Sequence, residues 1–111
     1  MNKLDQIQQV MREHDWMALI KLGAPVDEYD SIAESIYYLV DKGCPVSIAS
    51  KKIWDVFYQQ FCVWDSYQFE DDSSVKRIGT YYSNDDEAKK MIGSVEDFHD
   101  LAAEILNIIK D

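Results

Sequence analysis

The stretch IASKKIWDVFYQQFCV, residues 48–63, decides the fold that this sequence predicts. Ser47, directly before it, is a suitable N-cap residue. The large apolar residues that follow recur at helical spacing: Ile53, Val56, Phe57 and Phe61. Trp54 and Tyr58 flank that stripe, so the expected helix is apolar over much of its circumference. Because such a helix is buried on several sides, we expect it to lie at the centre of a helical bundle.

Three further principal helices are expected around this one. Residues 3–13 and 29–42 show the same apolar spacing, and Gly43 is a typical residue for the end of the second. The last helix follows Ser94, which with Asp97 approximates a capping box. Its apolar residues then run to the C-terminus at spacings of three and four.

The remaining segments are shorter or less regular. Short helical turns are expected at residues 16–23 and 84–93, the second with Asn84 as its cap. Within residues 64–83, the run VKRIGTYYS fits either a helical turn or a short strand. Four principal helices with short connections predict an all-α fold, a single-domain helical bundle that spans residues 1–111.

The composition supports a compact helical domain. The 111 residues are 47% hydrophobic and 13% aromatic, which is enough for one core but not for two domains of ordinary size. Only 4 Gly and 2 Pro are present, whereas a β-sandwich or barrel needs turn residues at roughly every 8–12 positions. These counts argue against a many-turned β fold and against intrinsic disorder.

The charge is strongly negative and becomes more so along the chain. The sequence has 11 basic and 21 acidic residues, a net charge of −10. Residues 1–55 hold 6 basic and 9 acidic residues, and residues 56–111 hold 5 and 12. Such a surface repels nucleic-acid phosphates and anionic membranes, so we expect neither as a partner. It suits a basic protein partner, although acidic composition can also serve solubility alone.

Targeting and membrane signals are not recognisable. The first 15 residues carry charges throughout, which is not typical of a signal peptide. No apolar run approaches the roughly 18 residues that a membrane span needs. Cys44 and Cys62 form no CxxC pair, and we expect both to be reduced thiols. These features predict a cytoplasmic protein.

Motifs for catalysis or cofactor binding are likewise not recognisable. GxSxG, HExxH, P-loop and dinucleotide-binding signatures are absent, and neither cysteine lies in a basic or Gly-rich context. His14 and His99 are isolated, and the acidic runs do not follow the EF-hand pattern. The element DEYD, residues 27–30, could supply carboxylates to a metal, but acids at a helix start explain it as well. We therefore predict that the chain is not an enzyme and has no catalytic site, metal site or cofactor.

One segment combines large aromatic rings with carboxylates. It begins VWDSYQFEDDSS, residues 63–74, and continues through a tyrosine pair to a second acidic run. Tyrosine and tryptophan are enriched in interface hot spots, and carboxylates can meet Lys and Arg of a partner. The competing interpretation is that the rings pack into the bundle, which we favour for Trp64 and Phe69, whereas the tyrosines are expected at the surface. The residues predicted to bind a partner are Trp64, Asp65, Tyr67, Glu70, Asp71, Asp72, Tyr81, Tyr82, Asp85 and Asp86.

Residues 14–57 resemble a group of small bacterial helical proteins. Their shared pattern is a Trp-Asp-Pro turn, a short Gly-containing stretch and a Pro-x-Asp-Glu-Tyr-Asp element that opens a helix. The likeness is carried here by Asp15, Trp16, Ala24, Pro25, Asp27, Glu28, Tyr29 and Asp30, followed by Gly43 and Ile48–Ala49. The chain departs from the pattern in having His-Asp-Trp-Met in place of Trp-Asp-Pro. Some small acidic helical proteins of this kind are immunity proteins, so the resemblance implies a helical fold and suggests that role.

Three functional hypotheses follow, of which we favour the first. The first is an immunity protein that neutralises a basic toxin domain, such as a nuclease of a contact-dependent growth inhibition system, by occluding its active or substrate-binding surface. The second is a regulatory or adaptor protein that acts through a helix face. The residues expected on that face of the last helix are Glu96, His99, Asp100 and Glu104. The third is a metal-binding protein that uses DEYD.

Overall fold

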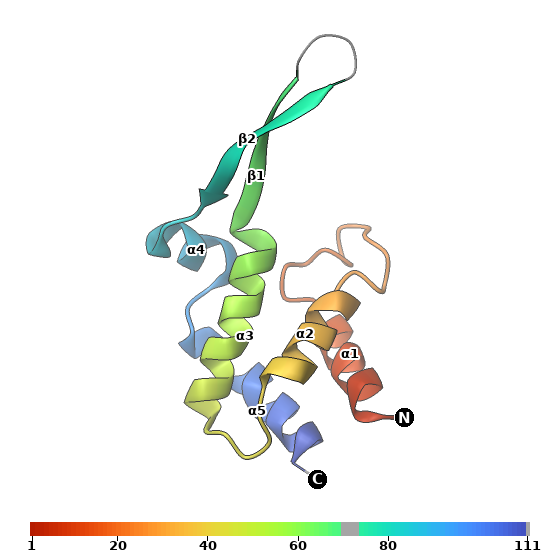
Figure 1. Cartoon of the computed structure of the whole chain (residues 1–111). Coiled ribbons are helices and arrows are strands. Elements are labelled where there is room, and N and C mark those ends of the chain that lie inside the picture. The colour runs from red at the N-terminus through yellow and green to blue at the C-terminus, as the bar shows by residue number, and fades with distance from the viewer. Residues whose placement is uncertain (70–73, 111) are drawn as a thin grey trace.

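A helical body with a projecting two-stranded arm forms the described part of the computed structural model, residues 1–69 and 74–110 (Figure 1). The helices are α1 (Lys3–His14), α2 (Asp30–Leu39), α3 (Val46–Phe61), α4 (Asp85–Ile92), the 3-10 helix η1 (Glu96–Phe98) and α5 (His99–Ile109). The strands are β1 (Val63–Phe69) and β2 (Val75–Tyr82), which pair antiparallel. The arm gives the molecule an elongated shape of 55 × 29 × 24 Å.

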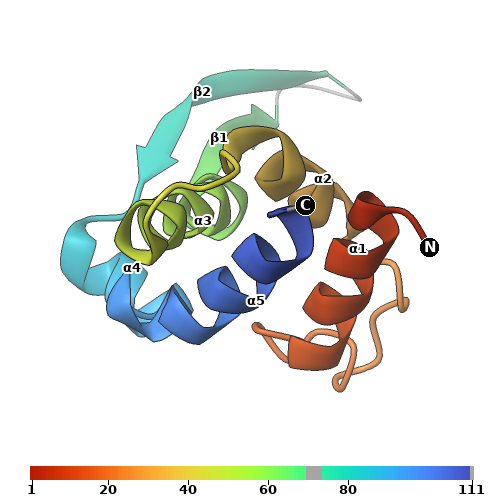
Figure 2. The ribbon, with the colours of Figure 1, turned by 90° about the horizontal axis from the view of Figure 1, so that it is seen from below.

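The helix α3 is central to the body, as the sequence predicted. It contacts α2, α4, α5, η1 and β1, and the view from below shows α5 lying between α3 and α1 (Figure 2). Ser47 is not its N-cap, because the helix already begins at Val46 and Pro45 occupies the cap position with an extended ψ of 152°. Proline is tolerated there because the first N–H groups of a helix have no intrahelical acceptor.

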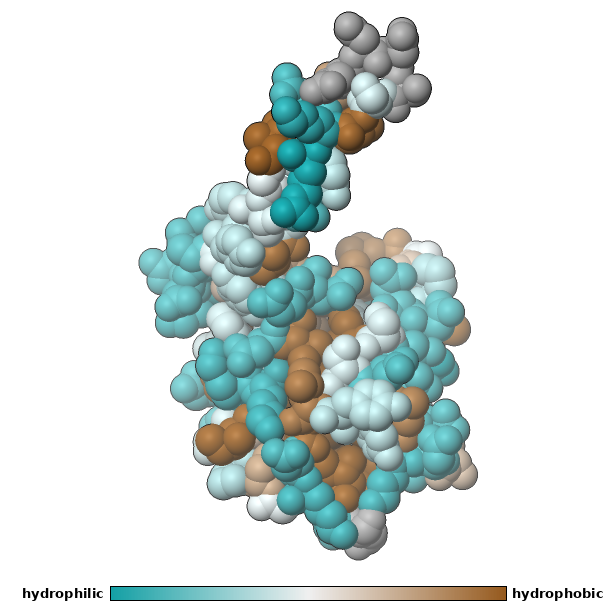
Figure 3. Space-filling view, viewed as in Figure 1, coloured by the Kyte–Doolittle hydropathy of each residue, from teal (hydrophilic) through white to brown (hydrophobic). Residues whose placement is uncertain are grey.

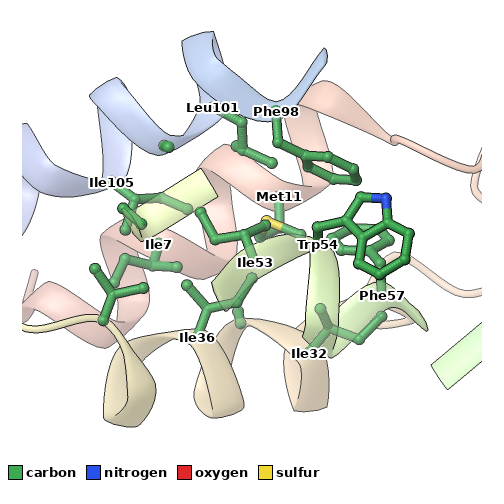
Figure 4. Close-up of a cluster of buried hydrophobic side chains, with 14 of the residues drawn as sticks. Ile7, Met11, Ile32, Ile36, Ile53, Trp54, Phe57, Phe98, Leu101 and Ile105 are labelled. Carbon is green, nitrogen blue, oxygen red and sulfur yellow. The ribbon is translucent and has the colours of Figure 1, made fainter. Parts of the chain in front are cut away.

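The core forms where the apolar stripes of α1, α2, α3 and α5 meet (Figure 4). Each of the following side chains is at most 3% exposed: Ile7, Met11, Ile32, Ile36, Ile53, Phe57, Phe98, Leu101 and Ile105. All of them lie in segments for which the sequence predicted helix. Burial of such side chains contributes about 1.5–3 kcal/mol each relative to exposure, so this cluster is the main source of stability.

Two indole groups hold the C-terminal end of α4 against the core. Trp16 Nε1 donates a hydrogen bond to the Ile92 carbonyl at 2.7 Å, and Trp54 Nε1 donates to the Gly93 carbonyl at 2.8 Å. The last carbonyls of a helix lack intrahelical donors, so these bonds satisfy groups that would otherwise need water. Trp16 also stacks on Phe98, with ring centroids 4.1 Å apart. The C-terminal end of α4 is therefore held by two residues from different parts of the chain, Trp16 and Trp54.

A carboxylate and a phenol organise the segment between α1 and α2. The hydroxyl of the fully buried Tyr29 donates to Asp15 Oδ1 at 2.7 Å. The Asp15 carboxylate also accepts the backbone N–H groups of Ile20 and Lys21, at 3.1 and 2.9 Å. Asp15 itself has a left-handed backbone, with φ 44°, and forms the C-cap of α1. One side chain thus joins the end of α1, the following turn and the start of α2.

The end of α2 lies earlier than predicted. The helix was expected to reach residue 42, but it ends at Leu39 and Val40 is extended, with ψ 118°. Lys52 Nζ on α3 donates to the Leu39 carbonyl at 2.8 Å and lies 3.0 Å from Asp41 Oδ2. A side chain of the neighbouring helix thus satisfies the last turn, which a pattern within α2 cannot reveal.

The all-α prediction is wrong, because the chain also contains an antiparallel two-stranded sheet and is therefore α+β. The helix predicted to end at residue 63 ends at Phe61, and VKRIGTYYS adopts the strand that was one of its two alternatives. The physical reason is the density of β-branched and aromatic side chains, which pack well on a pleated ribbon. These residues are Val63, Trp64, Tyr67, Phe69, Val75, Ile78, Thr80, Tyr81 and Tyr82.

The predicted cap at Asn84 is confirmed, and the predicted pairing of Ser94 with Asp97 forms ahead of η1. Asn84 Oδ1 accepts the backbone N–H of Glu87 at 2.9 Å and caps α4. Ser94 and Asp97 form a reciprocal capping box, with the Ser94 N–H donating to Asp97 Oδ2 at 2.9 Å and the Asp97 N–H to Ser94 Oγ at 3.4 Å. The start of α4 is therefore fixed by local side-chain chemistry. The last helix was expected to start at the Ser94 box, but α5 begins only at His99, after η1 and without a side-chain cap.

Removal of a core ring should be far more costly than removal of an arm ring. We expect Phe57→Ala to lower the free energy of unfolding by about 3–5 kcal/mol, because the fully buried ring leaves a cavity. Phe69→Ala removes the same side chain at a position that is 83% exposed, so its effect should stay below about 0.5 kcal/mol. Urea unfolding followed by circular dichroism measures both values. Equal losses would contradict the position of Phe69 on the arm.

The hydrogen bonds to Asp15 predict a specific loss of stability in acid. Burial raises the pKa of Asp15, but the Tyr29 hydroxyl and three backbone N–H groups outweigh burial, so the pKa is lowered overall. A carboxylate whose pKa is lower in the folded state stabilises the protein above its unfolded pKa, and this contribution is lost as the pH falls through the folded pKa. Asp15→Asn tolerates the left-handed backbone but cannot ionise. Thermal melts of both proteins at about pH 7 and about pH 3 measure this effect. At neutral pH the Tm of Asp15→Asn should be lower than that of the unmodified protein, and its Tm should fall less between about pH 7 and about pH 3. An equal fall in Tm for the two proteins would show that other carboxylates cause the acid sensitivity.

Candidate functional site

The arm formed by β1 and β2 is the strongest candidate for a functional site. The large apolar side chains on it that are more than half exposed are Phe69, Ile78, Tyr82, Tyr67 and Val75. Figure 3 shows hydrophobic atoms on the arm, well away from the core of the body. A two-stranded hairpin is at best marginally stable alone in water, and contiguous exposed apolar patches mark interaction sites. The arm thus presents side chains that a partner would bury.

The strand register gives the arm two different faces. Paired residues share a face, and side chains alternate along each strand. The Tyr67 face comprises Val63, Asp65, Tyr67, Phe69, Val75, Arg77, Thr80 and Tyr82. The Trp64 face comprises Trp64, Ser66, Gln68, Lys76, Gly79 and Tyr81. Ile78 pairs with no residue of β1, because the register shifts opposite Ser66 and Tyr67 to form a bulge.

The Trp64 face attaches the arm to the body. Trp64 and Tyr81 stack with ring centroids 4.5 Å apart, and the Tyr81 hydroxyl donates to Glu87 Oε2 on α4 at 2.6 Å. That hydrogen bond is the main cause of the raised pKa of Tyr81, since it stabilises the protonated phenol. At the base of β2, the Tyr58 hydroxyl of α3 donates to the Ser83 carbonyl at 2.6 Å. These contacts fix the direction of the arm relative to α3 and α4.

The Tyr67 face leaves its aromatic rings open to solvent. Asp65 Oδ1 accepts the Thr80 hydroxyl across the strands at 2.7 Å, and Asp65 Oδ2 accepts the Tyr67 hydroxyl at 3.4 Å. Asp65 therefore bonds within the arm. The rings of Tyr67, Phe69 and Tyr82 remain exposed beside Arg77 on the same face. Such a surface is apolar with polar tips, which is the chemistry of an interface anchor.

The structure brings the described members of the predicted partner-binding set to the arm and the start of α4. Those residues are Trp64, Asp65, Tyr67, Tyr81, Tyr82, Asp85 and Asp86, all of them exposed. Glu70, Asp71 and Asp72 lie outside the described residues. Asp85 and Asp86 belong to the first turn of α4, where the helix dipole also favours negative charge.

The expectation that Trp64 and Phe69 pack into the bundle is wrong. Trp64 is 47% exposed and Phe69 is 83% exposed, because both belong to the projecting strand β1. The prediction also missed Val75 and Ile78, which contribute apolar area to the arm. Their signal was present in the β-branched composition of VKRIGTYYS, but a solvated hairpin lacks the apolar and polar alternation that marks a half-buried strand.

The element DEYD has structural contacts. Tyr29 holds Asp15 as described above, and Asp30 Oδ2 pairs with Arg12 Nη2 at 2.7 Å. Within residues 1–69 and 74–110, no three His, Cys, Asp or Glu side chains are grouped so that they could hold a metal ion.

On α5, Glu104 pairs with His14 of α1, so part of the helix face considered for an adaptor already has an intramolecular contact.

Two further sequence features can be placed. Cys44 and Cys62 are free, and burial raises the pKa of the Cys62 thiol, which disfavours a nucleophilic thiolate. None of the helices in the described part of the chain has the length and apolarity needed to cross a membrane.

Comparisons with known proteins assign no family. No protein-family model, curated protein or solved structure matches this chain. The features that bear on a function are therefore the arm and the charge of the chain.

Loss of the Tyr81 hydroxyl should loosen the arm without unfolding the body. In Tyr81→Phe the hydrogen bond to Glu87 is lost while the stack on Trp64 is kept, so amide hydrogen exchange should become faster from Thr80 to Tyr82. Exchange in α3 and α5 should not change. Tyr82→Phe is the matched control, because Tyr82 is exposed on the other face. Equal effects of the two substitutions would show that Glu87 does not anchor the arm.

Proposed function

We propose that this chain is an immunity-type protein that binds and neutralises a basic toxin domain, and that the arm is its contact element. The observation that carries the proposal is the Tyr67 face: three aromatic rings and Val75 are exposed on a ribbon that is anchored on its other face. Aromatic side chains on a preorganised element lose little entropy on binding and are the usual hot spots of protein interfaces.

The charge of the chain supports a basic partner. The net charge is −10, but the described strands contain only Asp65 against Lys76 and Arg77. The negative charge therefore lies mainly outside the strands, and next to the arm it includes Asp85 and Asp86. We infer a division of roles in which the acidic surroundings attract the partner and the aromatic rings of the arm hold it. Electrostatic attraction raises the association rate, and buried rings slow dissociation.

The shape of the arm suits inhibition by occupancy. β1 has 7 residues, which gives a ribbon about 20 Å long at roughly 3.3 Å per residue. A ribbon of this size can enter a concave surface such as the substrate cleft of a nuclease. The proposed action needs no catalytic residue and no cofactor on this chain, and it would take place in the cytoplasm, where Cys44 and Cys62 would stay reduced.

The test is binding to the product of the gene immediately upstream, since a toxin gene commonly precedes its immunity gene. The purified pair should associate at low salt, and the association rate should fall strongly as salt is added, because exposed charges are screened beyond about 8 Å at physiological ionic strength. Expression of that product alone should be toxic, and co-expression of this chain should prevent the toxicity. A binding rate that does not depend on salt would contradict the role of the acidic surroundings.

The arm itself is tested by Phe69→Ser. We expect the Kd for the same partner to rise by about 30-fold or more, as for a hot-spot residue worth roughly 2 kcal/mol. Tyr38→Ala is the matched control, because Tyr38 is a similarly exposed ring on α2, outside the arm. Surface plasmon resonance measures both. Unchanged binding by Phe69→Ser would remove the arm from the interface.

A further inference from the structure

A second exposed apolar feature lies on the body, between α2 and α3. It is a groove of about 360 Å³, lined by Ser31, Ile32, Ser35, Leu39, Asp55, Val56, Gln59 and Gln60. Figure 3, drawn in the view of Figure 1, shows hydrophobic atoms exposed down the body where these two helices lie. The core does not cover Leu39, which is half-exposed. The groove is therefore apolar surface that the protein's own fold leaves open.

The form of the groove fits a helix. Its α2 side runs from Ser31 to Leu39, which is about 12 Å at a rise of roughly 1.5 Å per residue. Ser31, Ser35 and Leu39 are spaced by four, so they form one straight ridge along α2. A partner helix packs its own ridge of apolar side chains into a groove of this kind.

The chemistry of the rim favours a basic helix. Asp55 is the one charged residue in the described lining, and its pairing with Lys51 is a surface contact between half-exposed side chains. Surface pairs of this kind contribute little and exchange readily. Gln59, Gln60 and the two serines can both donate and accept hydrogen bonds, so the charge preference of the rim comes from Asp55. The floor, with Ile32 and Val56, is apolar. The apolar floor and the carboxylate of Asp55, on a chain of net charge −10, complement an apolar stripe flanked by Lys or Arg.

We propose that the groove between α2 and α3 is a second docking site, and that it takes a basic amphipathic helix presented by the partner. This inference rests on the proposed function, because it assigns a further contact to the same basic partner. Hydrophobic atoms on the arm and on the body where α2 and α3 lie are exposed on the face of the molecule drawn in Figure 3.

The test uses a defined probe: a synthetic helical peptide of about five turns with leucine on one face and lysine on the other. Titrated into the ¹⁵N-labelled full chain, it should give saturable chemical-shift changes confined to residues of α2 and α3 that line the groove. A peptide with glutamate in place of lysine is the charge control and should not bind.

The decisive variant is Leu39→Asp. It removes apolar area from the groove and adds a negative charge, so a purely electrostatic contact would become stronger. We expect the Kd for the lysine peptide to rise tenfold or more. Leu22→Asp adds the same charge at an exposed leucine outside the groove and should leave the Kd unchanged or slightly lower. Undiminished binding by Leu39→Asp, or shifts spread over the whole surface, would overturn the inference.

A dilution series without peptide tests whether a second copy of this chain, instead of a partner helix, occupies the groove. If the groove signals shift with protein concentration, a second copy of this chain covers the groove and the inference is overturned. The peptide experiment is independent of the upstream gene product. If the peptide fails to bind but Phe69→Ser weakens binding of the upstream gene product, the groove is ruled out as a docking site and the proposed function still stands.

Discussion

The contact of Phe57 with Phe98, beneath Trp16, is the interaction on which the rest of the structure depends. The Phe57 and Phe98 ring centroids lie 5.1 Å apart, and Trp16 is stacked on Phe98 and meets the edge of Phe57 at 6.2 Å. The cluster joins α3, η1 and the segment after α1, which are far apart in sequence. Through its indole N–H, Trp16 also holds the last turn of α4. Since the first turn of α4 carries Glu87, the core cluster indirectly sets where Tyr81 and the arm are held.

This arrangement separates the part of the chain that stabilises the fold from the exposed arm. The core consists of helices whose apolar stripes are buried, whereas the arm is a hairpin with little apolar cover of its own. A solvated hairpin belongs to the low-stability end of a protein, so substitutions at its exposed positions should change the free energy of unfolding little. The contacts of the Trp64 face hold the arm in one orientation relative to the body. Under the proposed function, this would reduce the conformational entropy that the arm loses when a partner binds.

The helices could be predicted from the sequence because each carries its own apolar periodicity, whereas several of their ends were placed wrongly because α2, α3 and α5 have no side-chain N-cap. Asn84 and Ser94 act on neighbours three residues away, so their effect is visible locally. The arm could not be predicted with the same certainty, because both faces of the hairpin are exposed and its residues follow no strict period. The aromatic content of β1 and β2 singled out a segment that is exposed in the structure, but the predicted environment of Trp64 and Phe69 was wrong. The groove between α2 and α3 was not predicted at all, since it depends on the distance between two helices.

The bulge at Ile78 has a consequence for the behaviour of the free protein. Both strands of the arm have an unpaired outer edge, and such edges are templates for strand addition and aggregation. A bulge bends and twists a ribbon and breaks the regular spacing of its outward N–H and C=O groups. A second ribbon therefore cannot pair in register along the full length, and Lys76 and Arg77 on adjacent positions oppose the close approach of an identical strand. The irregularity that makes β2 one residue longer should thus disfavour edge-to-edge association of the free protein.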